Sequence, residues 1–118
     1  MQAEITKDFR FEAAHFLPFV PDGHKCKHLH GHSYLITVRV TGSINEMGWV
    51  MDLNELGKVC KPIIKNLDHK LLNEIEGLSN PTSENLACFI FKKVIQKVPQ
   101  LSSVSVKATN SVSVTVTG

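Results

Sequence analysis

The spacing of hydrophobic residues changes twice along this chain, from every second residue to every third or fourth and back again. Odd positions from Ile5 to His15 share one face of an extended segment, and Phe9 and Phe11 make that face apolar. A second alternating run, rich in β-branched residues, extends from His32 to Thr41 and stops at Gly42. Residues 4–15 and 32–41 are therefore predicted to be strands, joined by a Pro- and Gly-containing loop.

Two segments with helical spacing follow. Asp52 and Glu55 resemble a capping box, and the apolar stripe after them predicts a helix over residues 53–66, with a kink or a lost backbone bond at Pro62. A second helix is predicted between Thr82 and Pro99, because capping residues precede another apolar stripe there.

The end of the chain returns to alternation. Val104 and Val106 precede a turn candidate at Asn110-Ser111, and alternate valines follow it, which predicts a closing hairpin. The order of elements predicts an α+β fold in which a four-stranded antiparallel sheet carries two helices on one face. A length of 118 residues predicts one domain over residues 1–118.

Charge and hydropathy exclude several classes of partner. The net charge is +2 and the charges are spread along the chain, so neither nucleic acid nor an anionic membrane is an expected partner. There is no apolar run of the roughly 20 residues that span a bilayer, and the first residues lack the apolar segment of a signal peptide. Three widely spaced cysteines suit free thiols. A cytoplasmic location is the expectation.

Four of the six histidines lie between His24 and His32. On an extended segment His30 and His32 project from one face about 7 Å apart, so their rings can converge on one metal ion. His15 ends the first predicted strand and can complete a set of three, which would leave the fourth position of a zinc ion open, as in catalytic sites. Three other interpretations fit the same residues: a solvated histidine-rich loop, a hydrogen-bonded His15 at the core margin, or a closed structural site with Cys26 as fourth ligand.

Five short motifs carry a resemblance to a known family. They are Phe11-Glu12-Ala13-Ala14-His15, Cys26-x-x-x-His30-Gly31-His32, Gly48-Trp49-Val50-Met51-Asp52, Leu67-Asp68-His69 and Pro81-Thr82-Ser83-Glu84-Asn85. Their order along the whole chain resembles that of 6-pyruvoyl-tetrahydropterin synthases and their bacterial relatives. The three residues between Cys26 and His30 resemble the spacing in 6-carboxy-tetrahydropterin synthase, the bacterial enzyme of queuosine biosynthesis.

The resemblance implies a zinc-dependent lyase of the tunnelling-fold type. It implies that His15, His30 and His32 bind Zn²⁺. It also implies that Cys26 removes a proton as a thiolate and that the pair Asp68 and His69 assists proton transfer. Lys25 and Lys27 beside the thiol would favour its charged form. For an arbitrary chain, Asp68-His69 would instead be an ordinary polar end of a helix.

The resemblance also implies a substrate, a pterin triphosphate. The expected reaction converts dihydroneopterin triphosphate to 6-carboxy-tetrahydropterin, acetaldehyde and triphosphate, and the segment Thr82-Ser83-Glu84 is expected to lie against the pterin ring. One position departs from the family. Ala108 stands where the family carries a glutamate that anchors the pterin, so substrate positioning is expected to be impaired. Either an engineered substitution or a natural variant would explain this alanine.

Two other functions remain open, and the chain is also expected to form an oligomer. The chain could be a 6-pyruvoyl-tetrahydropterin synthase, which eliminates triphosphate without cutting the side chain, or a non-catalytic zinc- or pterin-binding module. The open edges of a four-stranded sheet favour association. The resemblance implies subunits that form a barrel and a homohexamer, a dimer of trimers, with active sites between chains.

Overall fold

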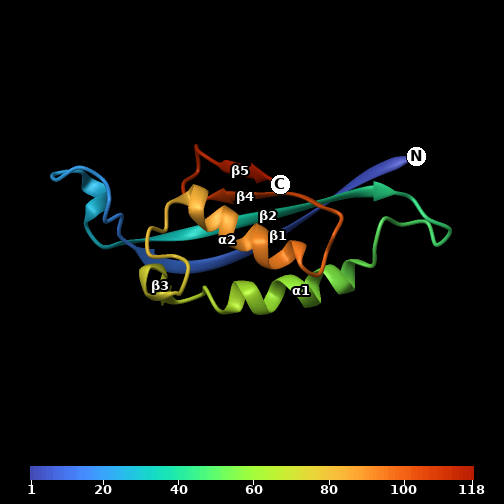
Figure 1. Ribbon diagram of the computed structural model, residues 1–118, viewed down its shortest axis with the longest axis horizontal. Coiled ribbons are helices and arrows are strands. Elements are labelled where there is room, and N and C mark those ends of the chain that lie inside the picture. The colour runs from blue at the N-terminus through green and yellow to red at the C-terminus, as the bar shows by residue number, and fades with distance from the viewer.

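The computed structural model describes residues 1–118 and contains a five-stranded sheet in the order β3-β1-β2-β4-β5 (Figure 1). The strands are β1 (Gln2–His15), β2 (His30–Ser43), β3 (Lys70–Leu71), β4 (Leu101–Lys107) and β5 (Val114–Thr117). The helices are α1 (Leu53–Lys65) and α2 (Ser83–Ile95), with short 3-10 turns η1 (Lys25–Lys27) and η2 (Leu72–Glu74). The predicted α+β class is confirmed, and the predicted strands and helices occur in the expected order with one additional strand, β3, between the helices.

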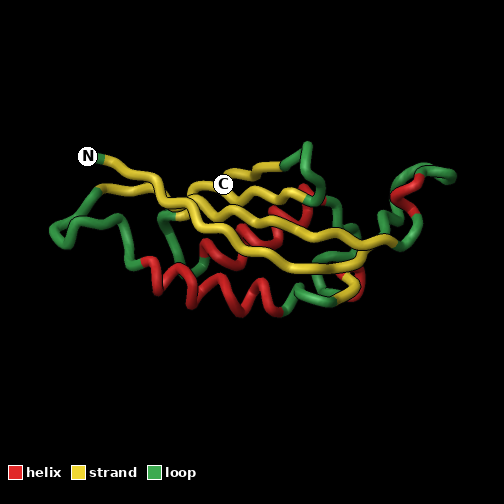
Figure 2. Tube along the Cα trace, turned by 180° about the vertical axis from the view of Figure 1, so that it is seen from behind, coloured by secondary structure: helices red, strands yellow, loops and turns green.

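Both helices lie on one face of the sheet, with α2 against β4 and β5 and α1 against β1. Seen from the opposite side, the strands lie in front of both helices (Figure 2). The covered face carries the alternate apolar residues of the two long strands, including Phe11, Ile36 and Val38, which are at most 2% exposed. Cys60 of α1 lies in the same core, and burial raises the pKa of its thiol to about 11, so that it stays protonated.

The prediction of four antiparallel strands was wrong in one respect, because β3 adds a fifth strand. β3 pairs with β1 in parallel over two residues, Lys70 and Leu71, opposite Ala13 and Ala14. A strand of two residues is too short for alternation to be visible in a sequence. The four predicted strands do pair antiparallel with one another.

The closing hairpin is confirmed, but its connection is longer than the predicted two-residue turn. β4 ends at Lys107 and β5 begins at Val114, so residues 108–113 form the loop. Val112, which was expected to begin the last strand, is 61% exposed. The alternation of valines continues past the hydrogen-bonded ladder, which is why the pattern overestimated the strand.

Both helices begin with a capping side chain. Asp52 accepts a hydrogen bond from the amide of Asn54, and Thr82 accepts one from the amide of Asn85. Pro62 lies within α1 on its exposed side, where water can reach the carbonyl that proline leaves unpaired. The backbone bond lost at Pro62 therefore does not end the helix, and α1 continues to Lys65. Neither helix combines the length and apolar character needed to cross a membrane.

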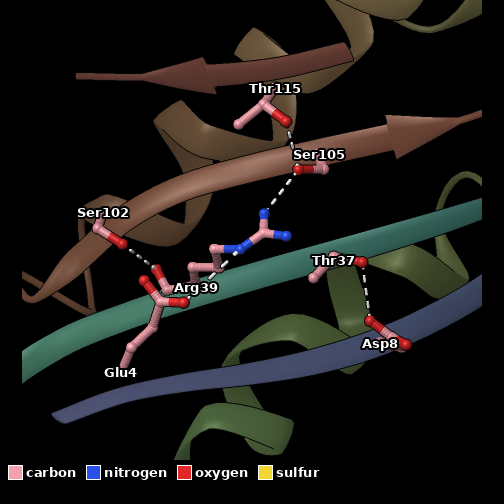
Figure 3. Close-up of polar contacts among 7 residues, drawn as sticks. All are labelled: Glu4, Asp8, Thr37, Arg39, Ser102, Ser105 and Thr115. Carbon is pink, nitrogen blue, oxygen red and sulfur yellow. Dashed lines mark hydrogen bonds and ion pairs between the residues drawn. The ribbon is translucent and has the colours of Figure 1, made fainter. Parts of the chain in front are cut away.

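The face of the sheet away from the helices is polar (Figure 3). Arg39 donates to Ser105 over 2.7 Å, Ser105 lies 2.7 Å from Thr115, and Thr37 donates to Asp8 over 2.8 Å. Each of these contacts joins neighbouring strands. The polar side chains therefore hold the strands in register on the face that no helix covers.

Candidate metal centre and adjoining clefts

Three histidines meet where β1 ends and β2 begins. His15 pairs directly with His30 in the antiparallel ladder, and His32 lies two residues further along β2 on the same face. One ring nitrogen from each residue lies within 4.8 Å of the other two. The three histidines singled out from the sequence are thus brought together, and His15 is only 4% exposed.

Two backbone carbonyls fix the orientation of the rings. His15 Nδ1 lies 2.8 Å from the carbonyl oxygen of Pro81, and His30 Nδ1 lies 2.7 Å from that of His28. A carbonyl only accepts, so each Nδ1 carries the proton and each Nε2 presents a lone pair. Carbonyls that accept from the far nitrogen in this way are the usual partners of metal-binding histidines.

The two Nε2 atoms of His15 and His30 lie 3.0 Å apart. With both protons on Nδ1, no hydrogen is available to bridge them, and two lone pairs face each other across the gap. Two ligands about 2.05 Å from a tetrahedral zinc ion lie about 3.3 Å apart, which is close to this separation. A cation between the rings would remove the repulsion, so this donor set fits a metal ion.

The surroundings also favour neutral imidazoles. Burial lowers the pKa of His15, although the hydrogen bond to Pro81 opposes this, and the neighbouring rings of His30 and His32 lower it further. Burial and the nearby His30 likewise lower the pKa of His32. Neutral rings are the metal-binding form, so the environment preserves the ligands near neutral pH.

A cavity of about 760 Å³ opens beside the three histidines. Its wall comes from β1, β2, η1, the start of α2, β4 and the loop before β5, and comprises His15, Leu17, Lys25, Cys26, His30, His32, Thr82, Ser83, Glu84, Val106, Ala108, Thr109, Val112 and Val114. Segments far apart in the sequence therefore converge on one site. The three residues expected to contact substrate, Thr82, Ser83 and Glu84, and the departure at Ala108 all lie in this wall.

Glu84 is the only carboxylate in the cavity wall. The cap of α2 is supplied by Thr82, and no side-chain hydrogen bond or ion pair engages Glu84. Ala108 contributes only a methyl group and packs partly against the core. The cavity thus has one carboxylate, and it comes from α2 rather than from the end of β4.

Cys26 lies in η1, half-buried, in the loop between β1 and β2. The two lysines beside it differ in placement. Lys25 lines the cavity, whereas Lys27 pairs with Asp22 and donates to the carbonyl of Val20. Only Lys25 therefore lies at the cavity as expected.

Asp68 and His69 lie outside this cavity. Asp68 Oδ1 accepts from the amide of Glu12 over 2.9 Å and lies 3.0 Å from His69 Nδ1. These contacts, led by that from the Glu12 amide, lower the pKa of Asp68. The His69 side chain is 77% exposed and lines a second cleft of about 580 Å³, beside β3. Within one chain, the Asp68-His69 pair and Cys26 therefore face different clefts, and His32 lines both.

Sequence reasoning missed two residues that contact His15. Tyr34 is 1% exposed and its hydroxyl lies 3.3 Å from His15 Nδ1, while Pro81 contributes its carbonyl. Alternation along β2 places Tyr34 on the face of His30 and His32, so this signal was present in the sequence. The role of Pro81 had no such signal, since any residue type offers a carbonyl.

Comparison with known proteins finds relatives over most of this chain. The family model of 6-pyruvoyl tetrahydropterin synthase matches residues 4–118. A 6-carboxy-5,6,7,8-tetrahydropterin synthase of Synechocystis is 46% identical over 112 residues, covering 89% of this chain and 85% of that protein. A dihydroneopterin monophosphate aldolase of Pyrococcus furiosus is 37% identical over 99 residues, covering 84% of this chain and 81% of that protein.

A solved structure extends the similarity to three dimensions. The 6-pyruvoyl tetrahydropterin synthase of Caenorhabditis elegans superposes with a TM-score of 0.92 at 27% identity, covering 100% of this chain and 96% of that one. The family match covers nearly every residue, including all those that line the cavity. This chain therefore belongs to the 6-pyruvoyl tetrahydropterin synthase family.

Proposed function

We propose that this chain is a zinc-dependent 6-carboxy-tetrahydropterin synthase of queuosine biosynthesis. Its reaction would convert 7,8-dihydroneopterin triphosphate to 6-carboxy-tetrahydropterin, acetaldehyde and triphosphate. The observation that carries the proposal is the convergence of three imidazole nitrogens at the wall of a cavity that also contains Cys26. The 46% identity to a protein of that name supports the choice of reaction.

The metal would be held by His15, His30 and His32. A bound zinc ion supplies Lewis acidity, which stabilises negative charge on substrate oxygen and makes neighbouring carbon-bound protons more acidic. Cys26 lines the same cavity and, as a thiolate, would accept such a proton at Sγ. Lys25 adds positive charge there, which favours the thiolate and a phosphorylated substrate.

The pterin would lie against the start of α2. Thr82, Ser83 and Glu84 line the cavity, and the Glu84 carboxylate is free to accept hydrogen bonds from ring N-H groups. At position 108, alanine cannot accept such bonds. Unpaired polar groups cost about 1 to 3 kcal/mol, which corresponds to roughly ten-fold or more in affinity. Weakened anchoring of the pterin is part of the proposal.

We further propose that one folded domain, residues 1–118, associates into a homohexamer built from two barrel-like trimers. β3 covers β1 only at Ala13 and Ala14, so most of that long edge is unpaired, and β5 forms the other edge. The exposed Asp68-His69 pair would then complete the site of a neighbouring subunit. The exposure of His69 and its place in a cleft other than the Cys26 cavity both favour this arrangement.

Ala108 favours one rival, a zinc- or pterin-binding module without turnover. A second rival is a 6-pyruvoyl-tetrahydropterin synthase, which the similarity to the Caenorhabditis elegans protein supports. The pyruvoyl enzyme would release triphosphate without acetaldehyde, and the binding module would release neither. One set of product assays therefore separates all three functions.

The metal prediction concerns the histidines. Purified protein is expected to contain about one zinc ion per subunit, and His32→Ala is expected to lose most of it, because one of three ligands is removed. His28→Ala is the matched control, since it keeps the carbonyl that accepts from His30. Elemental analysis after dialysis measures both. Equal zinc in the parent and His32→Ala, or none in the parent, would contradict the assignment.

The reaction prediction concerns the products. Zinc-loaded protein given dihydroneopterin triphosphate is expected to release acetaldehyde and triphosphate, and Cys26→Ala is expected to reduce the rate by about 10²- to 10⁴-fold, the usual contribution of a general base. Cys88→Ala, a partly buried thiol of α2, serves as the control. Triphosphate without acetaldehyde would favour the pyruvoyl enzyme, and no turnover even with glutamate at position 108 would favour the binding module.

The anchoring prediction concerns Ala108→Glu. Restoring a carboxylate is expected to raise kcat/KM for the pterin substrate by roughly ten-fold or more, because the ring N-H groups regain an acceptor. Ala108→Gln fills similar space without the charge and should give a smaller gain. Steady-state kinetics provide the values. An Ala108→Glu value equal to that of the parent would count against an anchoring role for this position.

The assembly prediction uses two inactive variants. Cys26→Ala and His69→Ala are each expected to be inactive alone, but mixed oligomers formed by co-expression should regain about a quarter of the parent activity, because one site in four would combine intact partners from two chains. The control is co-expression of Cys26→Ala with a variant that carries both Cys26→Ala and His69→Ala, because no site in that mixture contains an intact Cys26. Activity at the control level, or a monomeric mass in solution, would exclude shared sites.

A further inference from the structure

His24 caps the turn that carries the Cys26 thiol. Its backbone is extended, with φ −69° and ψ 133°, and its Nδ1 accepts a hydrogen bond from the Cys26 amide over 3.0 Å. Histidine is an unusual residue for this role, which serine, asparagine and aspartate commonly fill. The metal centre comprises His15, His30 and His32, and the cavity wall contains no part of His24, so its contact with Cys26 needs another explanation.

The Cys26 backbone is held on both sides. Its carbonyl accepts from the amide of Leu17 over 2.9 Å, and Leu17 lies two residues beyond the metal-centre residue His15. On the other side, His24 holds the Cys26 amide, and the carbonyl of His24 accepts from Lys27 over 3.1 Å. The first bond ties Cys26 to the end of β1. The second fixes the orientation of its peptide, and therefore the direction of its side chain.

The ring of His24 has a defined protonation pattern in this contact. Because Nδ1 accepts, the proton of the neutral ring lies on Nε2, which points away from the amide. The distance of the acceptor atom from the backbone is also fixed, since Nδ1 is bonded directly to Cγ. The side-chain oxygen of asparagine is bonded to Cγ as well, whereas that of glutamine lies one bond further out. Asparagine can therefore reproduce the contact, and glutamine cannot.

We propose that His24 is a positioning residue that directs the Cys26 thiol into the cavity beside the metal centre. The inference rests on the proposed function only in treating Cys26 as the base. The 3-10 turn has just three residues and a single capping side chain, and the contact with His24 is the hydrogen bond that holds the Cys26 amide. An otherwise exposed histidine thus acts on the reaction through Cys26.

The test compares His24→Ala, His24→Gln and His24→Asn in the zinc-loaded full chain. His24→Ala and His24→Gln are expected to lower kcat roughly ten-fold or more, because a displaced base loses its alignment with the substrate, while KM and zinc content stay near the parent values. His24→Asn is expected to retain most of the parent kcat. A role in overall folding alone would not separate asparagine from glutamine in this way.

A second measurement does not depend on turnover. The alkylation rate of Cys26 by iodoacetamide, followed by peptide mass spectrometry, is expected to rise about three-fold or more in His24→Ala and His24→Gln, because the half-buried thiol leaves the cavity, and to stay near the parent rate in His24→Asn. If the parent turns over no pterin, the proposed function fails while the alkylation series still tests His24. Equal rates in all four proteins, or His24→Asn matching His24→Ala, would overturn the positioning role.

Discussion

The pairing of His15 with His30 across the first two strands is the constraint on which the site depends. It places one ligand at the end of β1 and two at the start of β2, on the same face of the sheet. A shift of one residue would turn His30 and His32 to the opposite face and leave His15 without partners. The candidate metal centre is therefore a consequence of strand register, and no separate loop has to bring its three histidines together.

Contacts on both faces of the sheet hold that register. Phe11 stacks on Tyr34 at 5.0 Å on the covered face, next to the metal centre. On the open face, Thr37 of β2 donates to Asp8 of β1, and Arg39 of β2 lies 4.0 Å from Glu4 of β1. A shifted register of β1 against β2 would therefore lose apolar burial on one face and matched polar contacts on the other. Fixing the ladder along its length also fixes the histidines at its end.

Alternation and capping signals predicted four of the five strands and both helices, and the set of His15, His30 and His32 was one of several interpretations until the family resemblance favoured it. Both signals are local. Alternation reflects burial of one face of an element, and capping reflects a side chain that binds the first backbone amides of a helix. β3 was missed because two residues carry no period, and the loop before β5 was assigned too short because the valines continue to alternate beyond the hydrogen bonds. The separation of Cys26 from Asp68-His69 had no local signal either. It depends on which edge of the sheet each loop reaches, and that is set by the topology of the whole chain.

His32 lies between the two clefts that contain the expected catalytic residues. Its ring belongs to the metal centre, and the residue lines both the Cys26 cavity and the cleft beside His69. Within one chain, Cys26 and His69 line different clefts. A second chain at the open β1 edge can instead bring another cavity to the exposed Asp68-His69 pair. In the proposed oligomer, pairing at the edge of β1 would satisfy the unpaired backbone groups of that strand and would also bring the two sets of side chains to one site.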